Sequence, residues 1–130
     1  MSSGLPPGWE PGDEELAACD KNSYPSFLGD GTGERIVATL QTSPDDHRMV
    51  AFSIVQETKY EGMWRPVLEV DSRHGCVHRH QYARSTFDRV GPREVLKPIE
   101  CCDDVQDGYN AVIRELPEEW PIYKARWQNG

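Results

Sequence analysis

The sequence lacks any long hydrophobic run. None of its apolar stretches approaches the roughly 18 residues that a membrane-spanning helix requires. The sequence also has no basic start followed by an apolar core, the pattern that is typical of a signal peptide. Hydrophobic residues make up only 37% of the 130 residues, which is enough for one domain with a single small core. We therefore expect a cytoplasmic protein without membrane contact.

Several motifs of known enzyme classes are also missing. No G-x-S-x-G motif marks a serine nucleophile. The glycine-rich stretch GDGTG at 29–33 is not followed by Lys and Ser or Thr, so it is not a phosphate-binding P-loop. The cysteines lie at positions 19, 76, 101 and 102 and form no C-x-x-C pair. In a cytoplasm we expect these thiols to be reduced.

The chain lacks the positive charge that is typical of nucleic-acid-binding proteins, because its net charge is -8. The charge is uneven, however. Residues 72–97 contain six basic side chains against two acids, so this segment carries +4 and the remainder carries -12. Such a basic strip could bind a phosphate or an acidic partner. It could equally be neutralised by the protein's own carboxylates, and the sequence leaves both alternatives open.

Residues 1–34 contain few of the residues that build a core. They hold six glycines, four prolines and seven acids. We expect an irregular, acidic, Gly- and Pro-rich N-terminal segment, with one short helix over 13–19 that Asp13 can cap. Aromatic residues such as Trp9 could still hold this segment against the body. Residues 35–130 are expected to form a single α+β domain.

The hydrophobic pattern after residue 34 alternates with a period of two, which is typical of half-buried β-strands. It predicts four strands, over 35–42, 49–60, 64–70 and 76–83. A fifth strand, over 93–99, contains a proline and is therefore expected at an edge. A period of 3.6 then predicts one helix over 103–116, which Pro117 should stop. The predicted fold is α+β, an antiparallel four- to five-stranded sheet covered on one face by a C-terminal helix.

Three of the four histidines, His74, His78 and His80, lie within seven residues. The stretch CVHRHQYA is predicted to be a strand, so side chains of equal parity share one face. Cys76, His78, His80 and Tyr82 therefore line up on the same side of the sheet. The direction in which that side points decides what the histidines can do.

The length of the preceding turn determines which face carries the histidines. If the turn spans 71–75, the histidines share the face of Trp64 and Leu68. A turn one residue shorter instead places them on a polar face, opposite carboxylates, because a one-residue slip exchanges the two faces. We prefer the first register, because it avoids burying Arg79 and Gln81.

Metal binding and a purely structural role are two interpretations of the histidine cluster. As a metal site, His78 and His80 with Cys76 or His74 could bind zinc. One short cluster supplies too few ligands, so we expect no tight zinc site and no cofactor. As structural residues, the histidines would be ordinary polar members of a half-buried strand.

Acid–base catalysis is the third interpretation. Two histidines can cleave a phosphodiester bond in RNA when one imidazole takes the 2′-hydroxyl proton and the other protonates the leaving oxygen. The candidate catalytic residues are His78, His80, Tyr82 and Arg84, with the arginine stabilising the charge of the phosphorane. Such an enzyme would be a metal-independent ribonuclease.

The order of features from Tyr60 to about Leu116 resembles small prokaryotic toxins of the TumE type. The matching residues are Asp71 in EVDS, then His78 and His80 in VHRHQY, then the apolar stripe of the predicted helix. The match covers less than half of the chain, and the spacing between the acid and the histidines is shorter than in that family. The resemblance implies a growth-inhibiting toxin that is held by an antitoxin partner, with nucleic acid as its target.

Two functional classes therefore stay open. The first is a TumE-like enzyme that cleaves RNA with His78 and His80. The second is a non-catalytic protein-interaction or metal-binding module. A basic cleft with exposed histidine edges would favour the first. Histidines capped by carboxylates and sealed by the N-terminal segment would favour the second.

Overall fold

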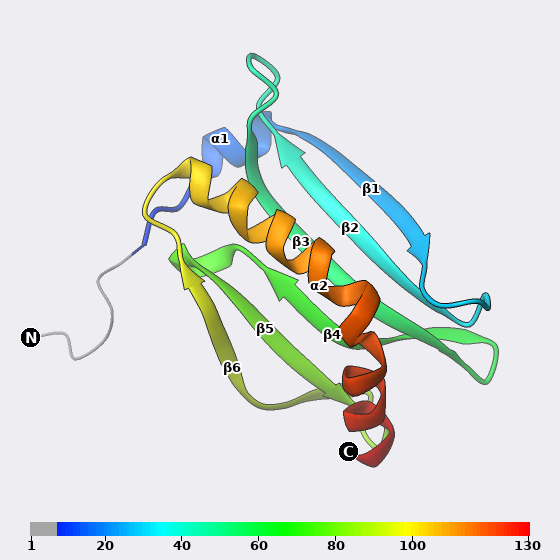
Figure 1. Ribbon diagram of the computed structural model, residues 1–130. Coiled ribbons are helices and arrows are strands. Elements are labelled where there is room, and N and C mark those ends of the chain that lie inside the picture. Colours follow the sequence, from blue (N-terminus) through cyan, green and yellow to red (C-terminus); the bar gives the residue numbers. More distant parts are fainter. Residues whose placement is uncertain (1–7) are drawn as a thin grey trace, which may run out of the picture.

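Six antiparallel strands, arranged in the order of the sequence, form one sheet (Figure 1). The structure is a computed structural model and describes residues 8–130. The strands are β1 (Asp20–Phe27), β2 (Glu34–Thr42), β3 (Met49–Tyr60), β4 (Met63–Asp71), β5 (Cys76–Ala83) and β6 (Asp88–Pro98). The four strands predicted between residues 35 and 84 are confirmed as β2 to β5. The predicted proline-containing strand is confirmed as β6, at one edge of the sheet.

The sixth strand, β1, lies in the segment that was predicted to be irregular. Its backbone pairs with β2 along its whole length, from Asp20 opposite Thr42 to Phe27 opposite Arg35. All of its side chains are exposed, so it has no buried face and no period-two pattern that would reveal it in the sequence. The short helix predicted nearby is confirmed as α1 (Asp13–Ala18). Residues 1–7 of the predicted segment lie outside the described residues.

Helix α2 (Cys102–Asn129) lies across one face of the sheet (Figure 1). The prediction that Pro117 stops this helix is wrong, because α2 continues through Pro117 and Pro121. Each proline inside a helix costs roughly 3 kcal/mol. Beyond both prolines, Tyr123 and Trp127 are only 6% and 2% exposed, and burying each large side chain contributes about 1.5–3 kcal/mol. The apolar contacts of the last two turns therefore offset much of the cost of the two prolines.

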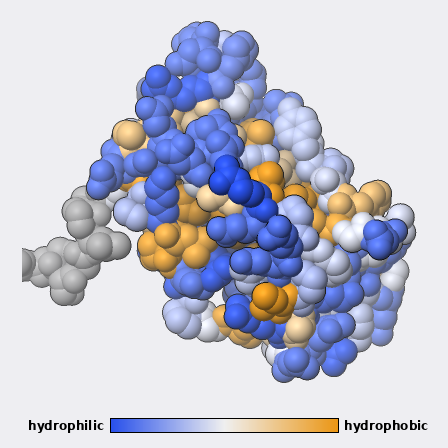
Figure 2. All heavy atoms as spheres, viewed as in Figure 1, coloured by the Kyte–Doolittle hydropathy of each residue, from blue (hydrophilic) through white to orange (hydrophobic). Residues whose placement is uncertain are grey.

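The hydrophobic core fills the space between α2 and one face of the sheet. The strands contribute Ile36, Ala38, Phe52, Ile54, Leu68, Val70 and Val77, and the helix contributes Val105, Val112, Leu116, Tyr123 and Trp127. We call the sheet face that α2 covers the helix face and the other the open face. Figure 2 shows that the surface on the side of α2 is mostly hydrophilic, with separate hydrophobic patches. Within residues 8–130, no helix is both long enough and apolar enough to cross a membrane.

A β-bulge in β4 changes which of its side chains face the helix. Gln56 of β3 pairs with Leu68, whereas the next residue, Glu57, pairs with Pro66, so Val67 is inserted without a partner. Both Val67 and Leu68 are buried. Because the insertion shifts the alternation by one, Trp64 lies on the open face although Leu68 lies on the helix face.

Gly108 allows the closest approach between α2 and the sheet. A Cβ atom at this position would lie 2.6 Å from Cγ2 of the buried Val77. Gly108→Ala is therefore expected to lower the free energy of unfolding by about 1–3 kcal/mol, the usual cost of overpacking a core. The higher helix propensity of alanine stabilises the variant by about 1 kcal/mol. This gain is smaller than most of the expected overpacking cost.

Urea denaturation measures this effect. Gly12→Ala is the matched control, because an added Cβ there meets nothing within 4 Å and the backbone φ is -68°. We expect the control to unfold close to the parent protein. An unchanged or higher stability of Gly108→Ala would contradict the tight contact between α2 and β5.

Candidate functional site

The pairing of β4 with β5 places carboxylates opposite the histidines. Asp71 pairs with His78, and Glu69 pairs with His80. The predicted register is therefore wrong: the histidines lie on the open face, together with Trp64 but on the side opposite Leu68. A slip of one residue inverts a strand, and the observed register has the polar-face parity that we considered second.

The reason for this error is that burial of Arg79 carries little cost in this fold. Arg79 lies on the helix face, where its guanidinium reaches outward to form an ion pair with Glu94 and a hydrogen bond to the hydroxyl of Tyr123. The Gln81 amide, on the same face, donates to the carbonyl of Tyr123 at 3.3 Å. Long polar side chains can cover apolar surface while their ends remain paired. Avoiding their burial was therefore a poor guide to register.

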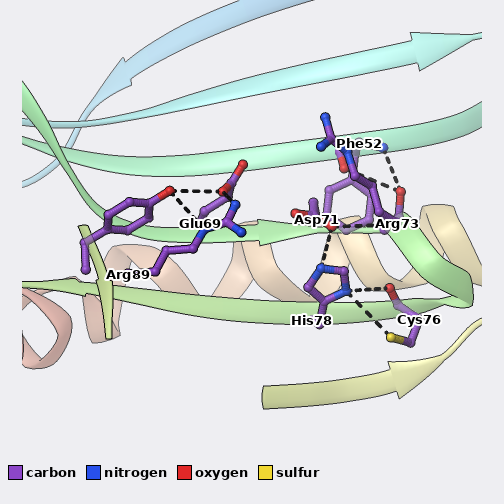
Figure 3. Close-up of polar contacts among 9 residues, drawn as sticks. Phe52, Glu69, Asp71, Arg73, Cys76, His78 and Arg89 are labelled. Atoms are coloured by element: carbon purple, nitrogen blue, oxygen red, sulfur yellow. Dashed lines mark hydrogen bonds and ion pairs between the residues drawn. The ribbon is translucent and has the colours of Figure 1, made fainter. Parts of the chain in front are cut away.

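Asp71 and His78 form a buried pair that joins β4 to β5. Figure 3 shows the two side chains pointing toward one another, and His78 Nε2 lies 2.8 Å from Asp71 Oδ1. Each residue is only 2% exposed. The other ring nitrogen, Nδ1, lies 3.3 Å from the carbonyl oxygen of Cys76 and 3.6 Å from its sulfur. Both nitrogens of His78 are thus occupied within the protein.

The ionised form of Asp71 is favoured despite its burial. Burial alone raises the pKa of this carboxyl group, but the hydrogen bonds from His78 and from the backbone N–H of Arg73 lower it by more. The pKa of Asp71 therefore lies below its ordinary value. An ionised carboxylate next to imidazoles can accept a hydrogen bond from an imidazole N–H group or bind a cation.

His80 is the more accessible member of the cluster. It is half-buried, and its ring packs edge-on against His78 with centroids 4.9 Å apart. Burial, then the positive charge of Arg89 and the neighbouring His78, lower the pKa of His80. This shift favours the neutral imidazole, whose nitrogen lone pair is free to bind. His80 has no hydrogen-bond partner among the residues that the structure describes.

Three potential metal ligands converge here. Asp71, His78 and His80 each offer one ligand atom, and these atoms all lie within 4.8 Å of one another. His74, which lies in the 3₁₀ turn between the strands (η1, Arg73–Gly75), is not part of this group. Its exposed ring stacks over that of His78 with centroids 6.2 Å apart. His74 therefore covers the cluster rather than completing it.

A polar row crosses the open face and ends at this cluster. Successive cross-strand partners are Ser23, Thr39, Ser53, Asp71 and His78. A groove of about 440 Å³ lies between this part of the open face and the segment around α1. Its lining includes Ser53, which pairs with Asp71, and Arg73, whose backbone binds the Asp71 carboxylate. The groove is within the size range of small-ligand sites. Its lining includes none of Asp71, His78 and His80, and it approaches them through Ser53 and Arg73.

The two other predicted site residues lie apart from the histidine pair. The hydroxyl of Tyr82 donates to Glu69 at 3.3 Å, and Arg89 binds the same carboxylate at 2.7 Å. Arg84 lies in the turn after β5, where its backbone N–H donates to the carbonyl of Trp127. The structure thus brings Tyr82 near the cluster through Glu69, and places Arg84 at the end of α2 instead.

The predicted basic strip is neutralised only in part. Arg79, Arg89 and Lys97 form ion pairs with the protein's own carboxylates. The other three basic residues of the strip, Arg73, Arg84 and Arg93, form none with residues 8–130. Sequence reasoning did not assign the pairing of Asp71 with His78 or the Glu69–Arg89 contact. Both depend on a register that the local pattern does not fix.

The buried pair is expected to stabilise the fold. Asp71→Ala removes the acceptor for His78 Nε2 and leaves a buried polar group without a partner, which costs about 1–3 kcal/mol. Asp71→Asn keeps an acceptor oxygen of the same size and is expected to cost less. Urea unfolding of both variants measures the difference. If Asp71→Ala were as stable as the parent protein, the pair would not hold β4 and β5 together.

Comparison with models of protein families, with curated proteins and with solved structures finds no match. The likeness to TumE-type toxins accordingly remains an expectation from the sequence. Its three matching residues, Asp71, His78 and His80, are those that the fold brings into one cluster.

Proposed function

We propose that the chain cleaves phosphodiester bonds in RNA at the cluster of Asp71, His78 and His80. The observation that carries this proposal is the convergence of these three side chains on the open face. The groove approaches them through Ser53 and Arg73, which contact Asp71 from its lining. The same residues carry the resemblance to TumE-type toxins, which implies a nucleic-acid target. RNA is the substrate class because imidazole acid–base chemistry uses the 2′-hydroxyl group. A toxin of this type would be held by an antitoxin partner.

The geometry favours unequal roles for the two histidines. A two-imidazole mechanism needs two ring edges that reach the substrate. His78 is 2% exposed and both of its nitrogens contact Asp71 or Cys76. His80 is half-buried and is therefore the group that the substrate reaches. His78 is buried beneath His80 and only positions the cluster. Cleavage therefore needs a second group, besides His80, to transfer protons to or from the RNA.

The groove offers a place for the RNA backbone. Arg73 and Lys21 line the groove, and so do the acids Glu10 and Asp13 near α1. Neither cation forms an ion pair with the described part of the chain. Guanidinium and ammonium groups bind phosphate well. The hydroxyl groups of Ser23, Thr39 and Ser53 add hydrogen-bonding groups along the floor.

A non-catalytic interaction module is the second candidate, and two observations favour it: a carboxylate, Asp71, caps His78, and the N-terminal segment lies against the neighbouring turn. The backbone of Gly8 packs so closely on Gly75 that a Cβ atom on Gly75 would lie 2.6 Å from Gly8 Cα. The Trp9 N–H donates to the carbonyl of Ile99, and Ile99 in turn donates to Gly75. The segment thus seals the turn beside the cluster, as an interaction module would require. RNA cleavage decides between the two candidates.

The cleavage assay uses the purified full chain on single-stranded and structured RNAs, with EDTA and with added divalent metal in separate arms. His80→Ala is expected to slow cleavage by at least roughly 100-fold, the lower end of the effect of losing a group at the reacting centre. His47→Ala is the matched control, because this histidine is exposed in the turn between β2 and β3. It should cleave as the parent protein does.

Two results would refute the proposal. The first is no cleavage of any RNA in any arm by the parent protein. The second is equal cleavage by His80→Ala, His47→Ala and the parent protein, which points to a contaminating nuclease. Either result would leave the interaction module as the function that the structure supports.

A further inference from the structure

We infer that Asp71, His78 and His80 form a binding site for one divalent transition-metal ion. The inference goes beyond RNA cleavage and is tested without RNA. The sequence alone predicted no tight zinc site, because only the ligands of one short stretch could be counted. The register of β4 against β5 adds a carboxylate from the neighbouring strand, and the count becomes three.

The distances suit a metal centre after small movements of side chains. Neighbouring ligand atoms lie roughly 2.8–3.1 Å apart around an octahedral ion and roughly 3.3–3.6 Å apart around a tetrahedral one, because each sits about 2.0–2.2 Å from the metal. Asp71 Oδ1 and His78 Nε2 are 2.8 Å apart, and all three ligand atoms lie within 4.8 Å of one another. Rotation of the half-buried His80 closes the wider gap, while Asp71 and His78 separate slightly.

The surroundings of His78 match those of a metal-bound imidazole. His78 Nε2 and Asp71 Oδ1 lie 2.8 Å apart, at hydrogen-bond distance, and a divalent cation can take the place of the hydrogen between them. The displaced ring proton then belongs on Nδ1, where the carbonyl oxygen of Cys76, 3.3 Å away, can accept it. A backbone carbonyl behind the ring is the usual device that orients a ligating histidine. The carboxylate of Asp71 is likewise fixed, by the backbone N–H of Arg73 at 3.0 Å.

The donor set indicates the class of metal. Two imidazoles and one carboxylate suit zinc and neighbouring first-row ions, whereas magnesium and calcium prefer oxygen ligands alone. Three protein ligands leave at least one coordination position open, as in catalytic rather than structural zinc sites. A metal-bound water in that position would supply the activating group that the buried His78 does not provide for RNA cleavage.

Titration of the metal-free full chain with Zn²⁺ by calorimetry, and with Co²⁺ by visible absorption, tests the site. We expect one ion per chain. His80→Ala and Asp71→Asn should each weaken binding by more than roughly 100-fold, since loss of an outer-shell partner alone costs 10–100-fold. These two variants are preferred to His78→Ala, which would remove a fully buried ring and could unfold the protein. Circular dichroism spectra like that of the parent protein will show that both variants are folded.

Two controls separate this site from adventitious binding. His47→Ala should bind as the parent protein does. The double variant Cys101→Ser/Cys102→Ser should also retain the ion, because these adjacent thiols are free and one of them is exposed. The inference is overturned if the parent protein binds no ion, if His80→Ala and Asp71→Asn bind normally, or if the double cysteine variant loses the ion.

The outcomes for metal binding and for RNA cleavage are independent. If the chain binds zinc but cleaves no RNA, the metal site stands and the proposed function is refuted. Cleavage that persists in EDTA, in a chain that binds no metal, keeps the proposed function and removes this inference.

Discussion

The contact between Asp71 and His78 is the constraint on which the functional face depends. It fixes how β4 aligns with β5, and in an antiparallel sheet one such alignment sets the partner of every other residue in the two strands. Glu69 then lies opposite His80, and the apolar residues of β5 face α2. The pairing of β3 with β4 separately places Ser53 and the hydroxyl row beside Asp71.

Elements with one buried face were predictable from the sequence, and elements without one were not. The alternation in β2 and β3 reflects burial on the helix face, so the period-two pattern located both strands. β1 is exposed along its length, and only its backbone pairing makes it a strand. Pro117 is a sound local signal for a helix end. The burial of Tyr123 and Trp127 beyond it, which keeps the helix going, could not be seen from the local sequence. Backbone pairing decided the first case, and the burial of side chains decided the second.

The candidate site was predictable in part for a related physical reason. The histidines attract notice because they are clustered along one strand, and period-two parity correctly placed His78 and His80 on the same face. Their carboxylate partner comes from a different strand, and finding it requires the register. That register could not be derived from the burial of Arg79, because its guanidinium pairs with Glu94 and Tyr123 at the margin of the core. The bulge at Val67 further separated Trp64 from Leu68.

We expect a metal ion to replace the hydrogen between Asp71 and His78. Long-range ¹H–¹⁵N NMR of the His78 imidazole, recorded before and after stoichiometric Zn²⁺, tests this most directly. Before zinc, we expect a proton on Nε2, facing Asp71. After zinc, Nε2 should be bound to metal and the proton should reside on Nδ1, facing the carbonyl of Cys76. An Nε2 proton that persists unchanged in the presence of zinc would show that no metal binds between these two side chains.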